Sequence, residues 1–229
     1  MLTLIYLTLF PSYFHNYFQL SLAKRALKQK KIDYQAYNLR DFANKKQVDD
    51  YPYGGGSGML LKIEPIVKAI AAVQKDYFDI YLILLSPQGK KITQKKIASL
   101  LKHSNIVFIC GHYEGIDARI WNYIDEQISI GDFITMGGEI PALAITEAII
   151  RAIPGIIKEE SYQQDSFTNN TKFDFDSYTR PAVFQNFSVP KVLLSGNHQK
   201  IEEWKKQNMQ TKIKNSRKLY HNKKKITPN

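Results

Sequence analysis

Cysteine is almost absent from this sequence, because Cys110 is the only one. One thiol excludes an intrachain disulfide, and no zinc-binding spacing is present. Cys110 ends the apolar run NIVFIC, which is typical of a small buried side chain rather than of a reactive thiol. The chain also lacks a Gly-Lys-Ser/Thr after its glycine-rich stretches, which argues against a P-loop phosphotransferase.

Long hydrophobic runs are also missing. The apolar residues 2–10 are too few to span a bilayer, and they lack the basic start and cleavage site of a signal peptide. We therefore expect a cytoplasmic protein with no membrane partner.

Acidic residues are scarce beside basic ones, with 21 Asp or Glu against 32 Lys or Arg and a net charge of +11. Residues 200–229 hold ten of the basic residues and only two acidic ones. Such a tail suggests a polyanionic partner, nucleic acid before membrane. A solvated tail without a partner is the alternative interpretation.

What the chain does contain is an alternation of apolar and amphipathic stretches, which predicts an α/β fold. Continuous apolar strands indicate a parallel sheet with helices on both faces. Strands are expected at residues 2–10, 32–39, 79–86 and 105–110, and residues 127–135 are expected to contain a last strand. Helices are expected at residues 11–30, 59–75, 93–102, 116–125 and 140–153. Ligands of such sheets bind beyond the carboxyl ends of the strands, where this chain places SPQG, GHYEGID and GDFITMGGE.

The composition changes near residue 158. We expect a first domain at residues 1–157 and a polar, aromatic interdomain linker at residues 158–177. Residues 178–229 are expected to form a small helical C-terminal domain with the basic tail, including a helix at residues 197–207.

Glycine clusters mark the candidate binding segments. In SIGDFITMGGEIPAL the glycines indicate either a turn or a main chain that lies against a ligand. PYGGGSGM could present backbone N–H groups to an anion, with a flexible surface loop as the alternative. In CGHYEGIDARI, Asp117 suits a helix N-terminus by charge, whereas this structural role does not explain Glu114.

Eight motifs together resemble one known family. DDYPYGGGSGM, LLSPQG, CGHYEGID, SIGDFITMGGEIPA, RAIPG, DSF, YTRP and VLLSGNH occur in this order. They are similar to those of the bacterial tRNA (guanine-37-N1)-methyltransferases, the TrmD-like members of the SPOUT superfamily, from residue 2 to about residue 204. The resemblance implies a deep trefoil knot and an obligate homodimer with its active sites between subunits. The implied reaction transfers a methyl group from S-adenosylmethionine to N1 of guanosine 37 in tRNA. Magnesium dependence is also implied, but the sequence shows no metal ligands.

The resemblance also implies site residues. Asp165 would be the base that takes the N1 proton, and Arg151 would stabilise negative charge on O6. Without the resemblance, a turn cap explains Asp165 and a surface position explains Arg151. The implied donor contacts are Leu84, Leu85, Ser86, Pro87, Gly111, Tyr113, Glu114, Gly115, Ile130, Gly131, Asp132, Phe133, Ile134, Thr135, Gly137, Gly138 and Pro141. The implied substrate contacts are Asp50, Gly55, Gly56 and Glu114.

Some positions depart from the family pattern. His112 and Ala118 stand where many relatives have arginine and glutamate, and Met136 could alter the adenine pocket. Two rival functions remain open: a nucleic-acid-binding protein that has lost catalysis, and a related SPOUT methyltransferase that acts on another base or on ribose. The retention of both Arg151 and Asp165 argues against the first.

Overall fold

The computed structural model describes residues 1–158 and 174–223. By its internal contacts the chain divides into two units, Met1–Lys158 and Glu159–Asn229. Each unit is described by itself.

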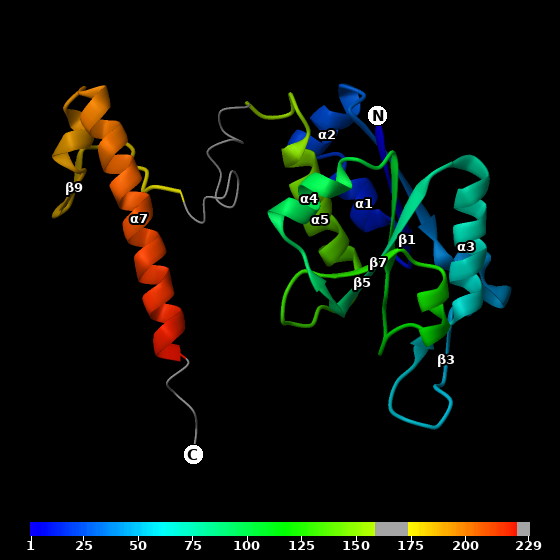
Figure 1. Cartoon of the computed structure of the whole chain (residues 1–229). Helices are drawn as coiled ribbons and strands as arrows, with labels where there is room; N and C mark the ends of the chain where they lie inside the picture. Colours follow the sequence, from blue (N-terminus) through cyan, green and yellow to red (C-terminus); the bar gives the residue numbers. More distant parts are fainter. Residues whose placement is uncertain (159–173, 224–229) are drawn as a thin grey trace, which may run out of the picture. The chain divides into compact units, whose positions relative to one another are not determined.

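The first unit is built on a five-stranded sheet (Figure 1). Its strands are β1 (Leu2–Thr8), β2 (Ile32–Asn38), β5 (Ile80–Lys91), β6 (Asn105–Cys110) and β7 (Glu126–Ser129), in the order β2-β1-β6-β5-β7. Every neighbouring pair runs parallel, so the predicted α/β fold with a parallel sheet is confirmed.

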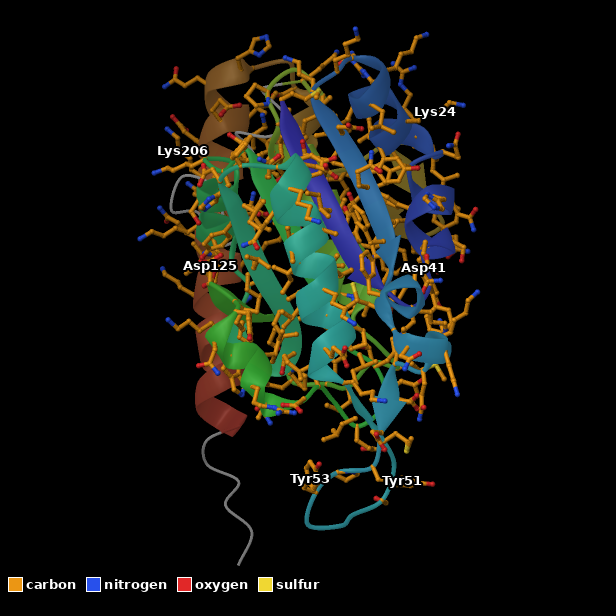
Figure 2. The ribbon with its side chains drawn as sticks, turned by 90° about the vertical axis from the view of Figure 1, so that its right-hand side faces the viewer. Lys24, Asp41, Tyr51, Tyr53, Asp125 and Lys206 are labelled. Carbon is orange, nitrogen blue, oxygen red and sulfur yellow. The ribbon has the colours of Figure 1, made fainter. Side chains whose placement is uncertain are left out.

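Helices cover both faces of this sheet (Figures 1 and 2). One face carries α3 (Ile63–Asp76), and the other carries α1 (Ser12–Tyr17), α2 (Ser21–Lys28), α4 (Gln94–Leu100) and α5 (Glu139–Ala152). Side chains of the interior strand β1 alternate between the two layers. Ile5 and Leu7 join the core beneath α3, whereas Tyr6 stacks on Phe14 of α1 with ring centroids 3.8 Å apart.

The helix predicted at residues 11–30 is interrupted. It forms α1 and α2 as separate helices, and Ser21, the first residue of α2, has a positive φ of 34°. The break leaves Phe18 stacked on Tyr34 of β2 at 3.9 Å. Periodicity alone could not reveal the break, because Phe14, Phe18 and Leu22 keep helical spacing through it.

Two further predicted helices are shorter than expected. The helix predicted at residues 59–75 begins only at Ile63, because Leu60–Leu61 form β4, which pairs antiparallel with β3 (Asp49–Asp50). The helix predicted at residues 116–125 is the 3-10 helix η3 (Ala118–Asn122). Asp117 caps it as expected, since its carboxylate accepts a hydrogen bond from the backbone N–H of Arg119 at 3.0 Å.

The strands nearest the predicted loops also differ from prediction. β5 runs through SPQG to Lys91, although residues 86–89 were expected to form a loop. It pairs with β7 on both sides of a register shift between Leu85 and Lys90. β7 itself ends at Ser129, so residues 130–138 form a long connection to α5 rather than a strand.

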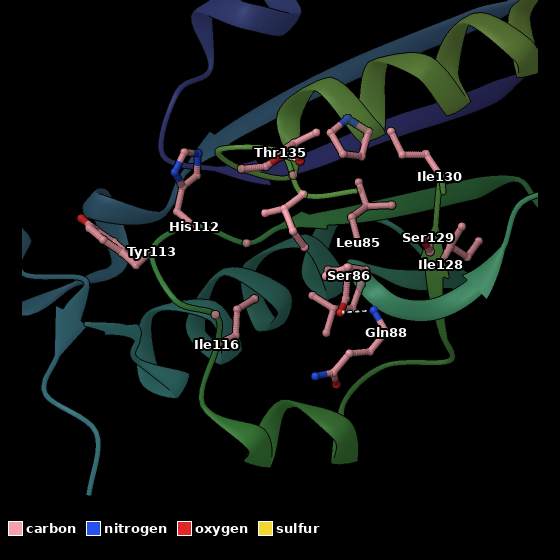
Figure 3. A pocket seen from close by; sticks show the side chains of 18 of the residues that line it. Leu85, Ser86, Gln88, His112, Tyr113, Ile116, Ile128, Ser129, Ile130 and Thr135 are labelled. Carbon is pink, nitrogen blue, oxygen red and sulfur yellow. Dashed lines mark hydrogen bonds between the residues drawn. The ribbon is translucent and has the colours of Figure 1, made fainter. Parts of the chain in front are cut away.

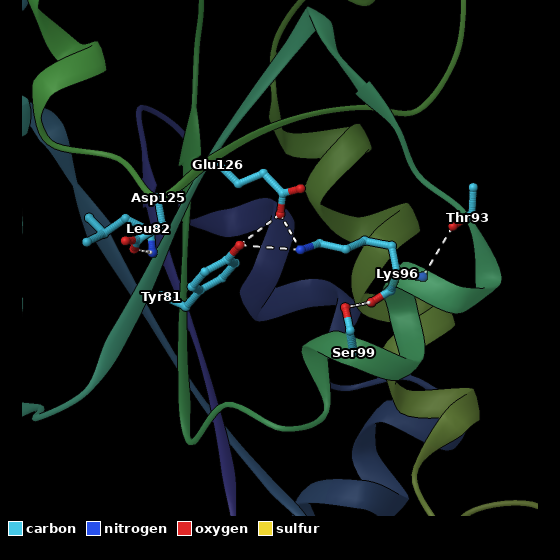
Figure 4. A network of polar contacts seen from close by, with 7 residues as sticks. All are labelled: Tyr81, Leu82, Thr93, Lys96, Ser99, Asp125 and Glu126. Atoms are coloured by element: carbon cyan, nitrogen blue, oxygen red, sulfur yellow. Dashed lines mark hydrogen bonds and ion pairs between the residues drawn. The ribbon is translucent and has the colours of Figure 1, made fainter.

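A polar network fixes β7 at the edge of the sheet (Figure 4). Lys96 of α4 forms an ion pair with Glu126 of β7, and the hydroxyl of Tyr81 in β5 donates to the same carboxylate at 3.0 Å. Burial opposes the charge on Lys96, but the hydrogen bond to Glu126 prevails and raises the pKa of the lysine. These contacts join α4, β5 and β7 at one end of the sheet.

The apolar face of α5 is satisfied within the chain. Ala142, Ile145, Ile149 and Ile150 are buried, and the buried hydroxyl of Thr146 lies 2.8 Å from that of Tyr6. The apolar composition of this helix therefore does not by itself require a partner subunit.

The second unit contains a short hairpin of β8 (Val183–Phe184) and β9 (Phe187–Ser188), the 3-10 helix η4 (Lys191–Leu194) and the long helix α7 (His198–Lys223). The helix expected at residues 197–207 is thus longer than predicted. Asp176, which precedes the hairpin in the sequence, contacts α7. Its carboxylate accepts a hydrogen bond from Asn208 at 2.9 Å and forms an ion pair with Lys212 at 2.5 Å. In neither unit does a described helix have the length and apolarity needed to cross a membrane.

Candidate active site

A pocket of about 450 Å³ lies where β5, β6 and β7 approach their carboxyl ends (Figure 3). Its wall comes mainly from residues 84–88, 111–116 and 128–138. The volume is in the range of small-molecule sites, and the position is where parallel sheets bind ligands. The three loops that the sequence placed at one edge of the sheet therefore do meet around one cavity.

Most of the residues assigned to the methyl donor line this pocket. Asp132 is the exception: its side chain is largely exposed and forms an ion pair with Lys91. Met136, which the sequence analysis connected with the adenine pocket, also lines this cavity. Sequence reasoning missed several other lining residues, namely Leu60, Gln88, His112, Ile116, Ile120, Trp121, Ile128 and Ser129. The adjacent motifs could have indicated His112 and Ser129, whereas nothing in the sequence pattern pointed to Trp121.

Hydroxyl side chains in the wall hold the loops in shape. The Ser129 hydroxyl donates to the carbonyl of Gly131 at 3.0 Å and accepts from the N–H of the same residue at 3.1 Å. Thr135 donates to the carbonyl of Gly137 at 2.8 Å. Ser86 accepts from the N–H of Gln88 at 3.2 Å. These hydroxyls bind neighbouring main chain, which favours a pocket that contacts its ligand largely through backbone.

Gly138, which lines the pocket, also has a packing role that the sequence did not indicate. Its N–H donates to the carbonyl of Gly111 at 2.8 Å. A Cβ at Gly138 would lie 2.6 Å from the Cα of Cys110 and 2.9 Å from the backbone N of Gly111. Glycine is therefore required there by the close packing of α5 against the end of β6, whether or not a ligand is bound.

A buried carboxylate joins two walls of the pocket. Glu139, the first residue of α5, is only 3% exposed. One of its oxygens accepts from the hydroxyl of Thr8 at 2.6 Å, and the other lies 2.7 Å from Nε2 of His112. Burial, reinforced by nearby Glu139, raises the pKa of the Cys110 thiol. Cys110 is thus the inert buried residue that was predicted.

A glycine-rich loop stands beside the pocket between β3 and β4 (Figure 2). Of the predicted substrate residues, Gly55 and Gly56 lie in this loop, and Asp50 lies at its base within 3.6 Å of Lys62. Glu114 lines the pocket itself, and its N–H donates to the carbonyl of Met59 at 3.1 Å. The structure thus connects the loop to the pocket wall.

Of the two predicted catalytic residues, only Arg151 is among the described residues, and it does not line this pocket. Arg151 is exposed in the last turn of α5, at the end of the helix opposite Gly138. Asp165 lies outside the described residues. Among the side chains that the structure describes, in residues 1–158 and 174–215, no three His, Cys, Asp or Glu are grouped so that they could hold a metal ion.

Comparison with known proteins gives a consistent result. The family model for tRNA (guanine-1)-methyltransferase TrmD matches residues 2–222. A tRNA (guanine-N(1)-)-methyltransferase of Metamycoplasma arthritidis is 45% identical over 93% of this chain and 92% of its own. A protein of the same name from Mesomycoplasma hyopneumoniae is 48% identical over 92% of both chains. The crystal structure of a tRNA (m1G37) methyltransferase from Aquifex aeolicus is similar with a TM-score of 0.79 and 39% identity, over 95% of this chain and 92% of that one.

Proposed function

The chain belongs to the tRNA (guanine-1)-methyltransferase TrmD family, and we propose from this that it methylates N1 of guanosine 37 in tRNA. One observation carries the proposal beyond the family name. Three segments that hold family motifs, although far apart in the sequence, enclose a single pocket of suitable size.

The pocket fits S-adenosylmethionine, which supplies the methyl group when bound. Its volume suits a ligand of this size, and its wall includes Leu85, Gly111 and Ile130. Gly115 and Pro141 lie in the same wall. These residues would hold the donor, and the packing of α5 on β6 would keep their segments in place.

The chemistry requires a base and a cation. Guanine N1 carries a proton near neutral pH and is a poor nucleophile until that proton leaves. A carboxylate within hydrogen-bond reach contributes about 10²- to 10⁴-fold to such a step. We assign this role to Asp165. Loss of the proton moves negative charge onto O6, which the Arg151 guanidinium would stabilise.

The distance between Arg151 and the pocket supports a homodimer. Arg151 lies 13 residues beyond Gly138, or about 20 Å along α5 at 1.5 Å per residue. One chain would then have difficulty bringing this guanidinium to its own pocket, so we propose that the partner subunit supplies it. Exposed apolar side chains at the pocket rim, including Ile134 and Met136, are consistent with a covered surface.

The remaining assignments are part of the same proposal. The deep trefoil knot rests on the family resemblance. Residues 1–157 would be the catalytic domain and residues 158–177 a linker. Residues 178–229 would bind tRNA through their basic surface, which is rich in lysine. A cytoplasmic location is expected from the substrate. Magnesium dependence rests on the resemblance alone, and no step is assigned to the metal because no described residues form a site for it.

Methylation of tRNA transcripts tests the function. With labelled S-adenosylmethionine, a transcript with G37 should accept one methyl group, and the same transcript with adenosine at position 37 should accept none. Equal labelling of both transcripts would place the reaction elsewhere. No labelling of either transcript would favour a binding protein that has lost catalysis.

A further inference from the structure

Two tyrosines stand almost free in solvent beside the pocket. Tyr51 is 78% exposed and Tyr53 is fully exposed at 102%, and both lie on the loop between β3 and β4 (Figure 2). A single exposed aromatic side chain is ordinary, because much of any protein surface is apolar. Two on one short loop next to a binding pocket suggest a surface that a ligand covers.

The loop is carried by the pocket wall. At its base, Asp49 and Asp50 pair with Leu61 and Leu60. The N–H of Leu61 donates to the carbonyl of Gly115 at 2.9 Å, and its carbonyl accepts from the N–H of Asp117 at 3.0 Å. The tyrosines are therefore fixed at their base to the segment that lines the pocket, so whatever they bind lies close to the pocket.

The glycines of the loop leave the rings uncovered. Gly54 and Gly55 have positive φ of 84° and 80°, and a Cβ at either position would meet no atom within 4 Å. Neither glycine is thus required by close packing against the rest of the chain. They give the backbone a conformation that other residues rarely adopt, in a loop surrounded by open space.

A cation belongs to the segment that holds the base of the loop. Arg119 follows Asp117, whose N–H donates to the carbonyl of Leu61, and its guanidinium forms an ion pair with the Asp117 carboxylate at 2.5 Å. Arg119 is exposed, with 68% of its side chain accessible. Exposed rings on the loop and an exposed guanidinium on the adjoining segment match the two parts of a nucleotide, a base to stack on and a phosphate to pair with.

We propose that Tyr51 and Tyr53 stack on the unpaired bases next to the target guanosine in the tRNA anticodon loop. This inference rests on the proposed function and names how that substrate is held. An enzyme that reacts with N1 must draw the target base out of its stack, which leaves the neighbouring bases without a stacking partner. Tyrosine rings at the pocket edge would replace that partner and keep the loop open.

Paired substitutions test the proposal. A Tyr51→Ala/Tyr53→Ala variant loses both rings, whereas Tyr51→Phe/Tyr53→Phe keeps them. Phe78→Ala is a matched control, because Phe78 is an aromatic residue 85% exposed just before the amino end of β5, at the other end of the strand from the pocket. Three readouts are needed: binding of a fluorescent anticodon stem–loop RNA, S-adenosylmethionine affinity by calorimetry, and molar mass by light scattering.

We expect the double alanine variant to bind the stem–loop about 5- to 100-fold more weakly. The phenylalanine variant and Phe78→Ala should bind like the wild type, with donor affinity and molar mass unchanged in all three. Wild-type RNA affinity in the double alanine variant would overturn the proposal. A change in molar mass would also overturn it, because the loop would then serve the partner subunit. If the wild-type protein binds the stem–loop but methylates no tRNA, the proposed function is wrong. The stacking proposal is then still decided by the RNA affinities of the variants.

Discussion

Glu139 shows how a single residue links the fold to the pocket. A carboxylate that is 3% exposed is costly to bury unless it is paired, and this one is held by Thr8 and His112. His112 belongs to the segment after β6, and Glu139 begins α5. Their contact therefore holds two walls of the pocket in register. His112 makes this contact through Nε2 at 2.7 Å.

Substitutions at His112 should separate positioning from folding. His112→Leu leaves a buried carboxylate oxygen without its partner, at a cost of about 1–3 kcal/mol. We expect donor affinity, measured by calorimetry, to fall by about tenfold, and His112→Arg to retain it. His103→Leu is a matched control, because His103 stacks on Tyr81 at 4.1 Å and does not line the pocket. Wild-type donor affinity in His112→Leu would show that the contact has no positioning role.

At the scale of elements, the packing of α5 against β6 determines at which glycine a substitution can test ligand binding. A side chain at Gly138 would collide with the backbone of Cys110 and Gly111. A Cβ at Gly111 would instead meet Ile116 at 3.4 Å, which is an ordinary contact. Both glycines line the pocket. Gly111 is therefore the position where added bulk can affect a ligand without disturbing the fold.

We predict that Gly138→Val lowers the melting temperature, because overpacking typically costs about 1–3 kcal/mol. Gly111→Ala should melt like the wild type yet bind S-adenosylmethionine more weakly, since its methyl group lies on the pocket wall. Thermal unfolding and calorimetry of both variants check this. A Gly138→Val protein with wild-type stability would contradict the packing role assigned to that glycine.

The sequence predicted elements well where composition alone defines them. β6 occupies residues 105–110 as expected, because an apolar run lies between Ser104 and Gly111. The sequence-based prediction of elements was wrong where tertiary contacts override the local sequence pattern. Leu60–Leu61 pair with β3 although they continue the spacing of a helix, and SPQG stays in β5 because β7 pairs on both sides of its register shift.

For the site, the family resemblance identified most of the pocket wall, and the physical reason for individual residues had to come from the structure. Gly138 was expected among the donor contacts, and the structure adds that the backbone of β6 requires a glycine there. Trp121 enters the wall from η3, a segment predicted as a regular helix without a binding role. No local signal marks a residue that a distant segment brings to the pocket.

At the scale of the whole molecule, the proposed homodimer requires two chains to share one active site. The pocket is formed at the start of α5, whereas Arg151 lies near its end. If the partner subunit supplies Arg151, a defect in the pocket and a defect in this arginine can be carried by different chains.

We predict that mixed dimers recover activity lost in each parent. One protomer would carry Arg151→Ala and the other a bulky Gly111→Val pocket substitution. One of the two composite sites in such a dimer keeps both a sound pocket and a sound arginine. Single-turnover methylation should therefore exceed that of either parent alone. Mixtures that never exceed the parents, in protein shown to have exchanged subunits, would place both groups in the same chain.

The atom that receives the methyl group tests the proposed reaction most directly. Wild-type protein would be incubated with S-adenosylmethionine and a G37 tRNA transcript, and the digested nucleosides identified by mass spectrometry. We predict 1-methylguanosine, located at position 37 alone. A methyl group on ribose, or on any other base, would contradict the assignment and favour a related methyltransferase of different specificity.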